Sequence, residues 1–375
     1  MLKKLKFVDI ILVLVPLILV ALSVALIYSL VFTSDDKILA FRQIFFALIG
    51  LAAMVSFTII DYRALRNLWW VFYLISFILL VIVDLFGQVS GGAMRWINLG
   101  FFQLQPSEVA KMALIIALAA FFSARVGKLR LRDYIWSAIL FVIPFLLILK
   151  EPDLGTGMVV AFIYFILIFY TRPSKLQFVS IIALSLLFVS VFILATFNVG
   201  PFGKLIQPYQ RNRIETFLDP KKDPYGQGYN VRQAQITLGS GGLFGRGLGQ
   251  GSQSQLKFLP KPHTDFIFAG VGEALGFIGS VLVILLFGLF IYRILTVAAY
   301  SQDNFGMLVA AGTAAMFLFQ VAINIGMNLG LAPVTGIPLP FLSSGGTSMV
   351  ISYALLGVVQ SIYLRYRQAN LPPID

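Results

Sequence analysis

The residues best placed for chemistry lie where a polar stretch meets an apolar one, at His263-Thr264-Asp265. Glu273 follows Asp265 by eight residues, a little over two helical turns, and so lies roughly on the same side. A carboxylate at such a boundary, beside the single histidine of the chain, could abstract a proton from a hydroxyl group. Helix capping would also explain Asp265, although Thr264 could cap equally well. The spacing suggests a general base without deciding between these roles.

A second candidate pair, Glu108 and Lys111, lies inside an apolar segment, where ionisable side chains are costly and often functional. Their spacing of three residues places both on one face of a helix. Two interpretations have similar weight. The residues form an ion pair that satisfies itself, or they form a charged cavity wall whose lysine contacts a diphosphate. We predict that both side chains face the interior and lie within salt-bridge distance.

The glycine-rich tract 239–251 does not match a nucleotide-binding loop. It lacks the Gly-Lys-Ser/Thr of a P-loop, and Gln250 stands where the dinucleotide fingerprint requires glycine. We interpret the tract as a loop that needs positive φ angles and close backbone packing. Backbone amides that approach a phosphate are a weaker alternative.

Composition indicates that helices crossing a membrane must position these residues. Of 375 residues, 59% are hydrophobic and 12% are charged, whereas soluble domains carry about 25% charged residues. Runs such as 8–32 are long enough to cross a bilayer. The absence of cysteine excludes disulfides and cysteine-ligated metals, and a single histidine excludes a multi-histidine metal centre.

Ten apolar segments predict an all-α polytopic membrane protein, a single membrane domain over residues 1–375. The segments lie near 9–33, 39–60, 67–86, 107–123, 134–149, 157–171, 177–197, 266–293, 304–328 and 346–364. Lysines and arginines of the short loops number fourteen on one side and four on the other, which places both termini in the cytoplasm. The net charge of +12 is therefore a topology signal, with contact to anionic lipids, and does not indicate a nucleic-acid partner.

Four outer loops converge on one face in this topology. The large loop 198–264, between the seventh and eighth segments, carries Arg211 and Arg213, and we expect it to be partly ordered because it contains aromatic residues. The shorter outer loops are rich in proline and glycine and carry further polar candidates; they are 87–106 with Arg95, 150–157 with Asp153, and 333–346 with Ser343. Turn chemistry alone would also explain Asp153.

These stretches resemble the SEDS family (shape, elongation, division and sporulation) over essentially the whole chain. The resemblance rests on Arg95-Trp96-Ile97, Gln105-Pro106-Ser107-Glu108-x-x-Lys111, Glu151-Pro152-Asp153-Leu154-Gly155-Thr156, Gly239-Ser240-Gly241-Gly242, Leu259-Pro260-x-x-His263-Thr264-Asp265-Phe266-Ile267-Phe268 and Pro338-Leu339-Pro340-Phe341. So many matches in the same order make the resemblance specific.

The resemblance implies a peptidoglycan glycosyltransferase that polymerises lipid II at the outer face of the bacterial cytoplasmic membrane. It implies a class B penicillin-binding protein as partner, together with other membrane proteins of the elongation complex. The family's essential aspartate falls on Asp265, the expected general base. The expected substrate-binding residues are Glu108, Lys111, Arg95, Asp153, Arg211, Arg213, His263 and Ser343. No cofactor is firmly implied, and a divalent cation, Mg or Mn, at the diphosphate is left open.

Some positions depart from the family pattern. Lys261 stands where glutamate is common, Ala274 replaces a second acidic residue, and Ser344 stands where tyrosine is usual. The stretch 334–338 and the short C-terminal tail look more like the RodA-type elongation enzymes than the FtsW-type division enzymes. The alternatives are a division-type polymerase, a lipid II flippase, and a scaffold of a cell-wall complex. Because the candidates cluster toward one side, a fixed site is favoured over a transport path.

Overall fold

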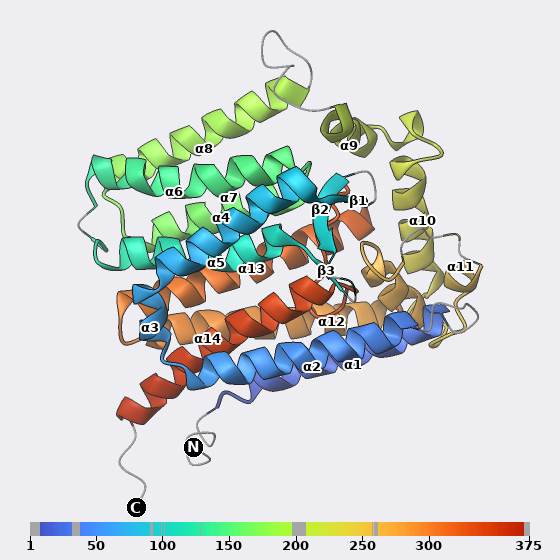
Figure 1. The fold of residues 1–375 in the computed structure, drawn as a ribbon. Helices are drawn as coiled ribbons and strands as arrows, with labels where there is room; N and C mark the ends of the chain where they lie inside the picture. The colour runs from blue at the N-terminus through green and yellow to red at the C-terminus, as the bar shows by residue number, and fades with distance from the viewer. Residues whose placement is uncertain are drawn as a thin grey trace, which may run out of the picture.

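The computed structural model describes residues 8–31, 38–90, 93–98, 100, 102–127, 129–196, 208–256, 258 and 262–370. A long helix occupies each of the ten predicted segments (Figure 1). These helices are α1 (Ile11–Val31), α2 (Ile38–Ile59), α4 (Trp69–Phe86), α5 (Pro106–Ser123), α6 (Leu131–Lys150), α7 (Leu154–Tyr170), α8 (Lys175–Thr196), α12 (Ile267–Tyr300), α13 (Asn304–Leu329) and α14 (Gly346–Asn370). Within the described residues, eight helices are long and apolar enough to cross a membrane, and α7 is a shorter apolar helix. The chain is a helical, multi-pass membrane protein.

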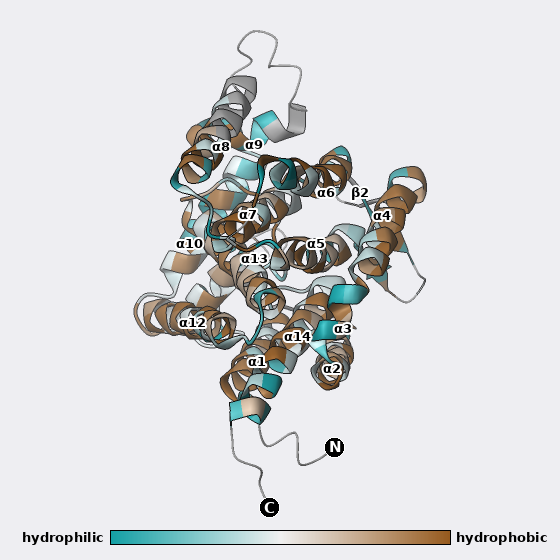
Figure 2. Ribbon diagram, turned by 90° about the vertical axis from the view of Figure 1, so that its left-hand side faces the viewer, coloured by the Kyte–Doolittle hydropathy of each residue, from teal (hydrophilic) through white to brown (hydrophobic). Residues whose placement is uncertain are grey.

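Burial separates central helices from peripheral ones. The most apolar windows of α5, α13 and α14 are 83%, 72% and 78% buried inside the protein, whereas that of α4 is only 17% buried. Figure 2 shows hydrophobic residues along the helices and hydrophilic residues on α3 (Tyr62–Asn67) and other connections at the helix ends. Exposed apolar side chains on the peripheral helices are those that face lipid in a membrane protein.

The described part of the large loop packs at the end of the bundle opposite the two chain termini (Figure 1). It contains α9 (Pro208–Leu218), a 3₁₀ turn at Pro220–Lys222, α10 (Gln227–Ser240) and α11 (Ser252–Gln255). A Cβ built on Gly272 of α12 would lie 2.8 Å from the side chain of Leu238, so α10 packs closely on α12. Partial order is thereby confirmed for residues 208–256. The motif residues Leu259 and Pro260, and Lys261, lie outside the described residues.

A small antiparallel sheet occupies the predicted loop 87–106. Its strands are β1 (Gln88–Ser90), β2 (Ala93–Asn98) and β3 (Gln103–Leu104), in the order β1-β2-β3. Ile97 pairs with Leu104, so β3 leads directly from the sheet into α5. The sheet was not predicted, because its strands are too short to show a clear two-residue alternation.

The helix α12 is broken at Gly276, which has φ 70° and ψ −167°. We predicted one uninterrupted segment, 266–293. At Gly276 this was wrong, because its left-handed φ angle interrupts the helix. The glycine tract pairs with the break: Arg246 N donates to Glu273 O (2.9 Å) and Phe277 N donates to Gly242 O (2.8 Å).

Close approach explains the glycines of the tract. A Cβ on Gly245 would clash with the carbonyl oxygen of Ala274, and a Cβ on Gly276 would clash with the amide nitrogen of Gly245. Positive φ angles occur at Gly242, Gly245, Gly247 and Gly249. The interpretation of the tract as a closely packed loop with positive φ angles is confirmed.

Candidate functional site

Segment 333–346, which we call the hub, lies at the end of the bundle that carries the large loop. Several polar residues of the candidate site bond to it. Ser343 Oγ donates to Thr264 O (2.6 Å) and accepts from Leu339 N (2.8 Å). Ser344 N donates to the carbonyl of His263 (2.8 Å). These bonds join the turn that carries Asp265 to the hub. Ser343 is buried, so its role here is to hold this turn in place.

The backbone of Asp265 is fixed by two amide side chains of α13. Asn324 Nδ2 and Asn328 Nδ2 donate to Asp265 O at 3.2 and 3.1 Å. Asn328 Oδ1 also accepts from Ala269 N (3.1 Å), in the first turn of α12. The two asparagines are four residues apart on one face of α13, and they bond this helix to the start of α12. Their contact with the candidate base was not predicted, because it joins residues about 60 positions apart.

The side chain of Asp265 is partly exposed, in the turn just before α12. Phe266 occupies the cap position of this helix, which has no side-chain cap bond. The cap residue of α12 is therefore Phe266 and not Asp265. Asp265 Oδ2 lies 4.0 Å from the place of a Cβ on Gly336, so the carboxylate borders the hub. Gly336 has φ +74°, a conformation that favours glycine.

Helix α9 brings Arg213 to the same place. Arg213 Nη1 donates to the carbonyl of Thr335 (3.0 Å), next to Gly336. Arg211, two residues earlier on α9, is also partly buried. Because residues two apart do not share a helix face, the two arginines point in different directions. Of the two, the described hydrogen bonds tie Arg213 to the hub.

Arg95 and Asp153 meet at the turn between α6 and α7. Arg95, on β2, donates through Nε to Glu151 O (3.1 Å) and through Nη2 to Pro152 O, and its Nη1 lies 3.9 Å from Asp153 Oδ1. Asp153 accepts from Thr156 N (3.1 Å) and so caps α7. The structural interpretation of Asp153 as a turn residue therefore has direct support.

Two residues of the α5 start complete the shell around Asp153. Gln105 Nε2 and Ser107 Oγ donate to Asp153 Oδ2 at 3.1 and 3.2 Å. A Cβ on Gly155 would lie 2.9 Å from Thr335 O, the carbonyl that Arg213 contacts. The Arg95–Asp153 cluster and the Asp265 turn are thus neighbours across the hub. Neither Gln105 nor Ser107 was predicted as part of a site, although both stand in the motif that contains Glu108.

Glu151 is a buried acid that sequence reasoning did not single out. Its side chain is 2% exposed, and within the described part of the chain neither carboxyl oxygen has a hydrogen-bond partner. Burial raises the pKa of Glu151 to about 9, with a further increase from the Asp153 carboxylate that Arg95 opposes. Glu151 is therefore protonated at neutral pH. Its sequence signals were its place at the start of the motif 151–156 and its position two residues after the apolar segment 134–149.

Glu108 and Lys111 face the interior, as predicted. Lys111 Nζ lies 2.7 Å from Glu108 Oε1, and the two side chains are 1% and 2% exposed. Glu108 N donates to Gln105 O (3.1 Å), which places the pair one turn beneath the Asp153 shell. The pairing is confirmed, while a contact with a diphosphate remains a prediction.

Glu273, eight residues after Asp265, contacts the end of the glycine tract. It is buried, its Oε1 accepts from Gln253 N (2.9 Å), and a Cβ on Gly251 would clash with its carboxyl group. This glutamate therefore anchors the end of the glycine tract. The tract folds back over α12 here and covers the side chain.

Phe341, within the hub, has a strained backbone conformation and packs against three aromatic rings. Its φ angle is 63°, in the left-handed region that bulky residues rarely adopt. Its ring lies 5.7, 5.7 and 5.0 Å from the rings of Phe290, Phe317 and Tyr353, respectively. The aromatic packing holds this backbone shape, and strain of this kind is concentrated at functional sites.

The described side chains do not form a metal centre of their own. Among the residues with assigned positions, no group of three or more His, Cys, Asp or Glu could hold a metal ion. A divalent cation, Mg or Mn, at the diphosphate stays a prediction, and no step below passes through it.

The fold and the cluster define a class: a multi-pass membrane protein with a polar site at one end of its bundle. The chain belongs to the family of cell cycle proteins FtsW, RodA and SpoVE, whose profile matches residues 3–368. The peptidoglycan glycosyltransferase MrdB of Escherichia coli K12 is 38% identical over 93% of both chains. Stage V sporulation protein E of Bacillus subtilis 168 is also 38% identical, over 96% of this chain and 98% of its own.

Solved structures agree with this assignment. A chain from a peptidoglycan synthase complex that coordinates polymerization and crosslinking superimposes with a TM-score of 0.80, at 32% identity, covering 96% of this chain and 99% of that one. The rod shape determining protein RodA of Thermus thermophilus superimposes with a TM-score of 0.69, at 30% identity, over 97% and 98% of the two chains. The SEDS resemblance is thus confirmed, and the chain is a glycosyltransferase.

Proposed function

We propose that this chain polymerises lipid II into glycan strands, with Asp265 as the general base. The observation that carries the proposal is the way Asp265 is held. Asn324 and Asn328 donate hydrogen bonds to its backbone carbonyl, while the partly exposed carboxylate borders the hub. Glycosyl transfer needs such an arrangement, because a fixed base must meet a mobile acceptor hydroxyl.

The chemical step follows from these positions. Asp265 accepts the proton of an acceptor sugar hydroxyl, whose oxygen attacks the anomeric carbon of the donor. The bond from that carbon to the diphosphate breaks, and the electron pair leaves with the polyprenyl diphosphate. The leaving group needs little protonation, so one base suffices. The transition state has oxocarbenium-like character at the anomeric carbon, while negative charge develops on the departing diphosphate. Arg213 and Arg95 are placed to stabilise that negative charge.

The experiment is lipid II polymerisation by purified Asp265→Asn protein, with Asp219→Asn on the same outer segment as the matched control. Asparagine keeps the size of the side chain and removes the base, so the rate should fall by roughly 10²–10⁴-fold. The control should polymerise normally. A near-normal rate for Asp265→Asn would exclude its role as base, and joint loss of thermal stability would indicate a structural role.

The proposal includes a place in the cell. We place both termini in the cytoplasm and the hub at the outer face of the bacterial membrane, supported by the excess of lysine and arginine at the end with the termini. Reporter fusions in the described outer turn at 223–226 should score as extracytoplasmic. A cytoplasmic score would invert the topology.

The proposal also includes an elongation role beside a class B penicillin-binding protein and other elongation-complex membrane proteins. The RodA-like stretch 334–338 supports it, and the related chain from a synthase complex supports a crosslinking partner. Relatives named MrdB and FtsW are 38% and 36% identical, so identity alone does not separate elongation from division. Restoration of rod shape, and not of division, in cells depleted of each native enzyme would decide for the elongation role.

A further inference from the structure

The glycine tract holds two apolar side chains in the open beside the break in α12. Leu243 and Phe244 are 63% and 80% exposed. Their backbone is paired with the second half of the helix: Phe277 N donates to Gly242 O (2.8 Å), and Ile278 N donates to Leu243 O (3.2 Å). The tip of the tract therefore lies directly against a helix that spans the membrane.

The pairing fixes where the tip lies. The break at Gly276 leaves backbone groups that an unbroken helix would satisfy, and such groups need partners inside a membrane. The tract supplies them on both sides of the break, since Arg246 N and Gly247 N donate to Glu273 O (2.9 Å) and Ala274 O (3.0 Å). Its glycines permit this contact, as the clash of a Cβ on Gly245 with Ala274 shows. The tip cannot leave α12 without exposing these groups.

The surface beside the tip is one that faces lipid. Phe277, Ile278 and Leu282, on the apolar helix α12, are 63%, 45% and 56% exposed. Leu243 and Phe244 continue this apolar surface beyond the break. Phenylalanine and leucine beside basic residues are typical of segments that lie at the boundary between hydrocarbon and headgroups.

A basic residue follows the tip and is held in place. Arg246 Nε donates to Ser240 O (2.8 Å) and Nη1 donates to Ser252 Oγ (3.0 Å), while the side chain remains exposed. An exposed guanidinium beside apolar side chains matches the level of anionic headgroups.

We propose that Leu243 and Phe244 insert into the lipid leaflet at this end of the bundle, with Arg246 at the headgroups. The tract 241–251 is then a membrane anchor for the outer segment. It steadies the first half of α12, which begins next to Asp265. This anchor is independent of the reaction that the site performs.

The test uses the absence of cysteine, which lets one spin label be attached at one chosen position. Phe244→Cys is labelled in the full chain, without any partner, in nanodiscs of zwitterionic and anionic phospholipid. Collision rates with oxygen, which concentrates in lipid, and with a water-soluble nickel chelate then report the depth of the label. Phe277→Cys is the lipid reference, and Tyr225→Cys, at a position that is 95% exposed on the same outer segment, is the water reference.

The label at position 244 should collide mainly with oxygen, as at position 277, while the label at position 225 should collide mainly with the nickel chelate. Water-like behaviour at position 244 would overturn the proposal. Shielding from both reagents would also overturn it, because a protein surface such as a second copy would then cover the tip. If Phe244→Cys fails to fold, Leu243→Cys carries the same test.

Discussion

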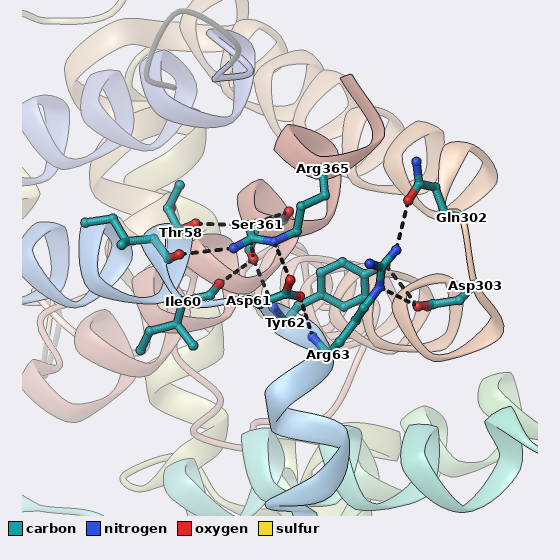
Figure 3. A network of polar contacts seen from close by, with 10 residues as sticks. Thr58, Ile60, Asp61, Tyr62, Arg63, Gln302, Asp303, Ser361 and Arg365 are labelled. Carbon is teal, nitrogen blue, oxygen red and sulfur yellow. Dashed lines mark hydrogen bonds and ion pairs between the residues drawn. The ribbon is translucent and has the colours of Figure 1, made fainter. Parts of the chain in front are cut away.

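The two ends of the bundle differ in the groups that hold their backbone in place. At the end that carries the termini, charged side chains pair with each other (Figure 3). Arg63 Nε lies 3.3 Å from Asp303 Oδ2, and Arg365 Nε lies 3.3 Å from Asp61 Oδ2. Tyr62 OH donates to the same oxygen of Asp303 (3.1 Å). Every one of these groups is engaged in holding helix ends together.

Arg365 shows this use most clearly. Its Nη2 donates to Ile59 O (3.0 Å), and its Nη1 donates to Ser361 O (3.0 Å) and, at 3.3 Å, to Thr58 O. The last carbonyls of a helix have no partner within it, so this arginine satisfies the end of α2 from α14. The network joins α2, α3, α13 and α14, and the charged groups named here bond to one another or to helix ends.

Around Asp265, neutral amides and hydroxyls hold the backbone, while Arg213 and Arg95 donate to carbonyls of the neighbouring turns. Asn324, Asn328 and Ser343 bond to carbonyls around Asp265. Close by, Glu151 is buried with neither oxygen hydrogen-bonded in the part of the chain that the structure describes. The comparison indicates that paired charges hold the end with the termini together. The other end keeps a buried acid without a hydrogen bond, Glu151, near the fixed carboxylate of Asp265.

The largest effect should come from Lys111, which forms a buried ion pair with Glu108 beneath the hub. Lys111→Ala leaves Glu108 buried without its partner, which should lower the free energy of unfolding by about 3–5 kcal/mol. Thermal unfolding of the purified protein would measure this. Exchanging the two residues should harm less than either single change, because a pair is kept.

Lys150→Ala is the matched control for burial. Lys150 lies 2.6 Å from Asp84, but its side chain is 65% exposed. Breaking this pair should cost at most about 1 kcal/mol. Equal losses for Lys111→Ala and Lys150→Ala would mean that burial does not govern the pair at the hub.

Glu151 should make the hub end sensitive to pH. Its pKa is raised from 4.5 to about 9 on folding, so the folded state binds the extra proton between these values. Stability should therefore fall as the pH rises through this window, by up to about 1.4 kcal/mol per pH unit. Glu151→Gln removes this dependence. Its stability relative to that of the unmodified protein should therefore increase as the pH rises. Parallel stability–pH curves for the two proteins would contradict the raised pKa.

The parts of the fold that depend on local pattern were predictable. Long apolar runs located the helices, and a spacing of three residues paired Glu108 with Lys111, because neighbours on a helix face are close in sequence. The break at Gly276 was not predicted. A single glycine in an apolar run is compatible with an intact helix, and only the distant tract supplies the bonds that stabilise the break.

The candidate site was predictable as a set of loops but not as a set of contacts. The outer loops were expected to converge, and the hub does join Asp265, Arg213 and the Asp153 turn. Most of the contacts that join these parts are hydrogen bonds from a side chain to a backbone carbonyl far away in the sequence. Any residue supplies a carbonyl, so no residue type at positions such as Thr335 signals the contact in advance.

Asn328 should show that the hub depends on neutral amides. Asn328→Ala leaves Ala269 N without its side-chain acceptor and removes one of two donors to Asp265 O. A lost bond that leaves a buried polar group unpaired costs about 1–3 kcal/mol. Polymerisation should fall further than stability alone predicts, because the turn that carries the base loosens. Unchanged polymerisation by a destabilised protein would show that this amide only holds helices together.

The smallest effect should come from the exposed pair at the opposite end. The side chain of Arg63 is 51% exposed, so Arg63→Ala should cost only about 0.2–1 kcal/mol and less still at high salt. Asp303→Ala should cost more, because Asp303 Oδ1 also accepts from Gly306 N (2.7 Å) as the cap of α13. A double-mutant cycle in thermal unfolding separates the pair from the cap, with exposed Arg66→Ala on the same short helix as control.

Polymerisation should stay normal in Arg63→Ala, since this end does not contact the hub. A loss of polymerisation without a loss of stability would show that the two ends are coupled, and would end the division of labour between them.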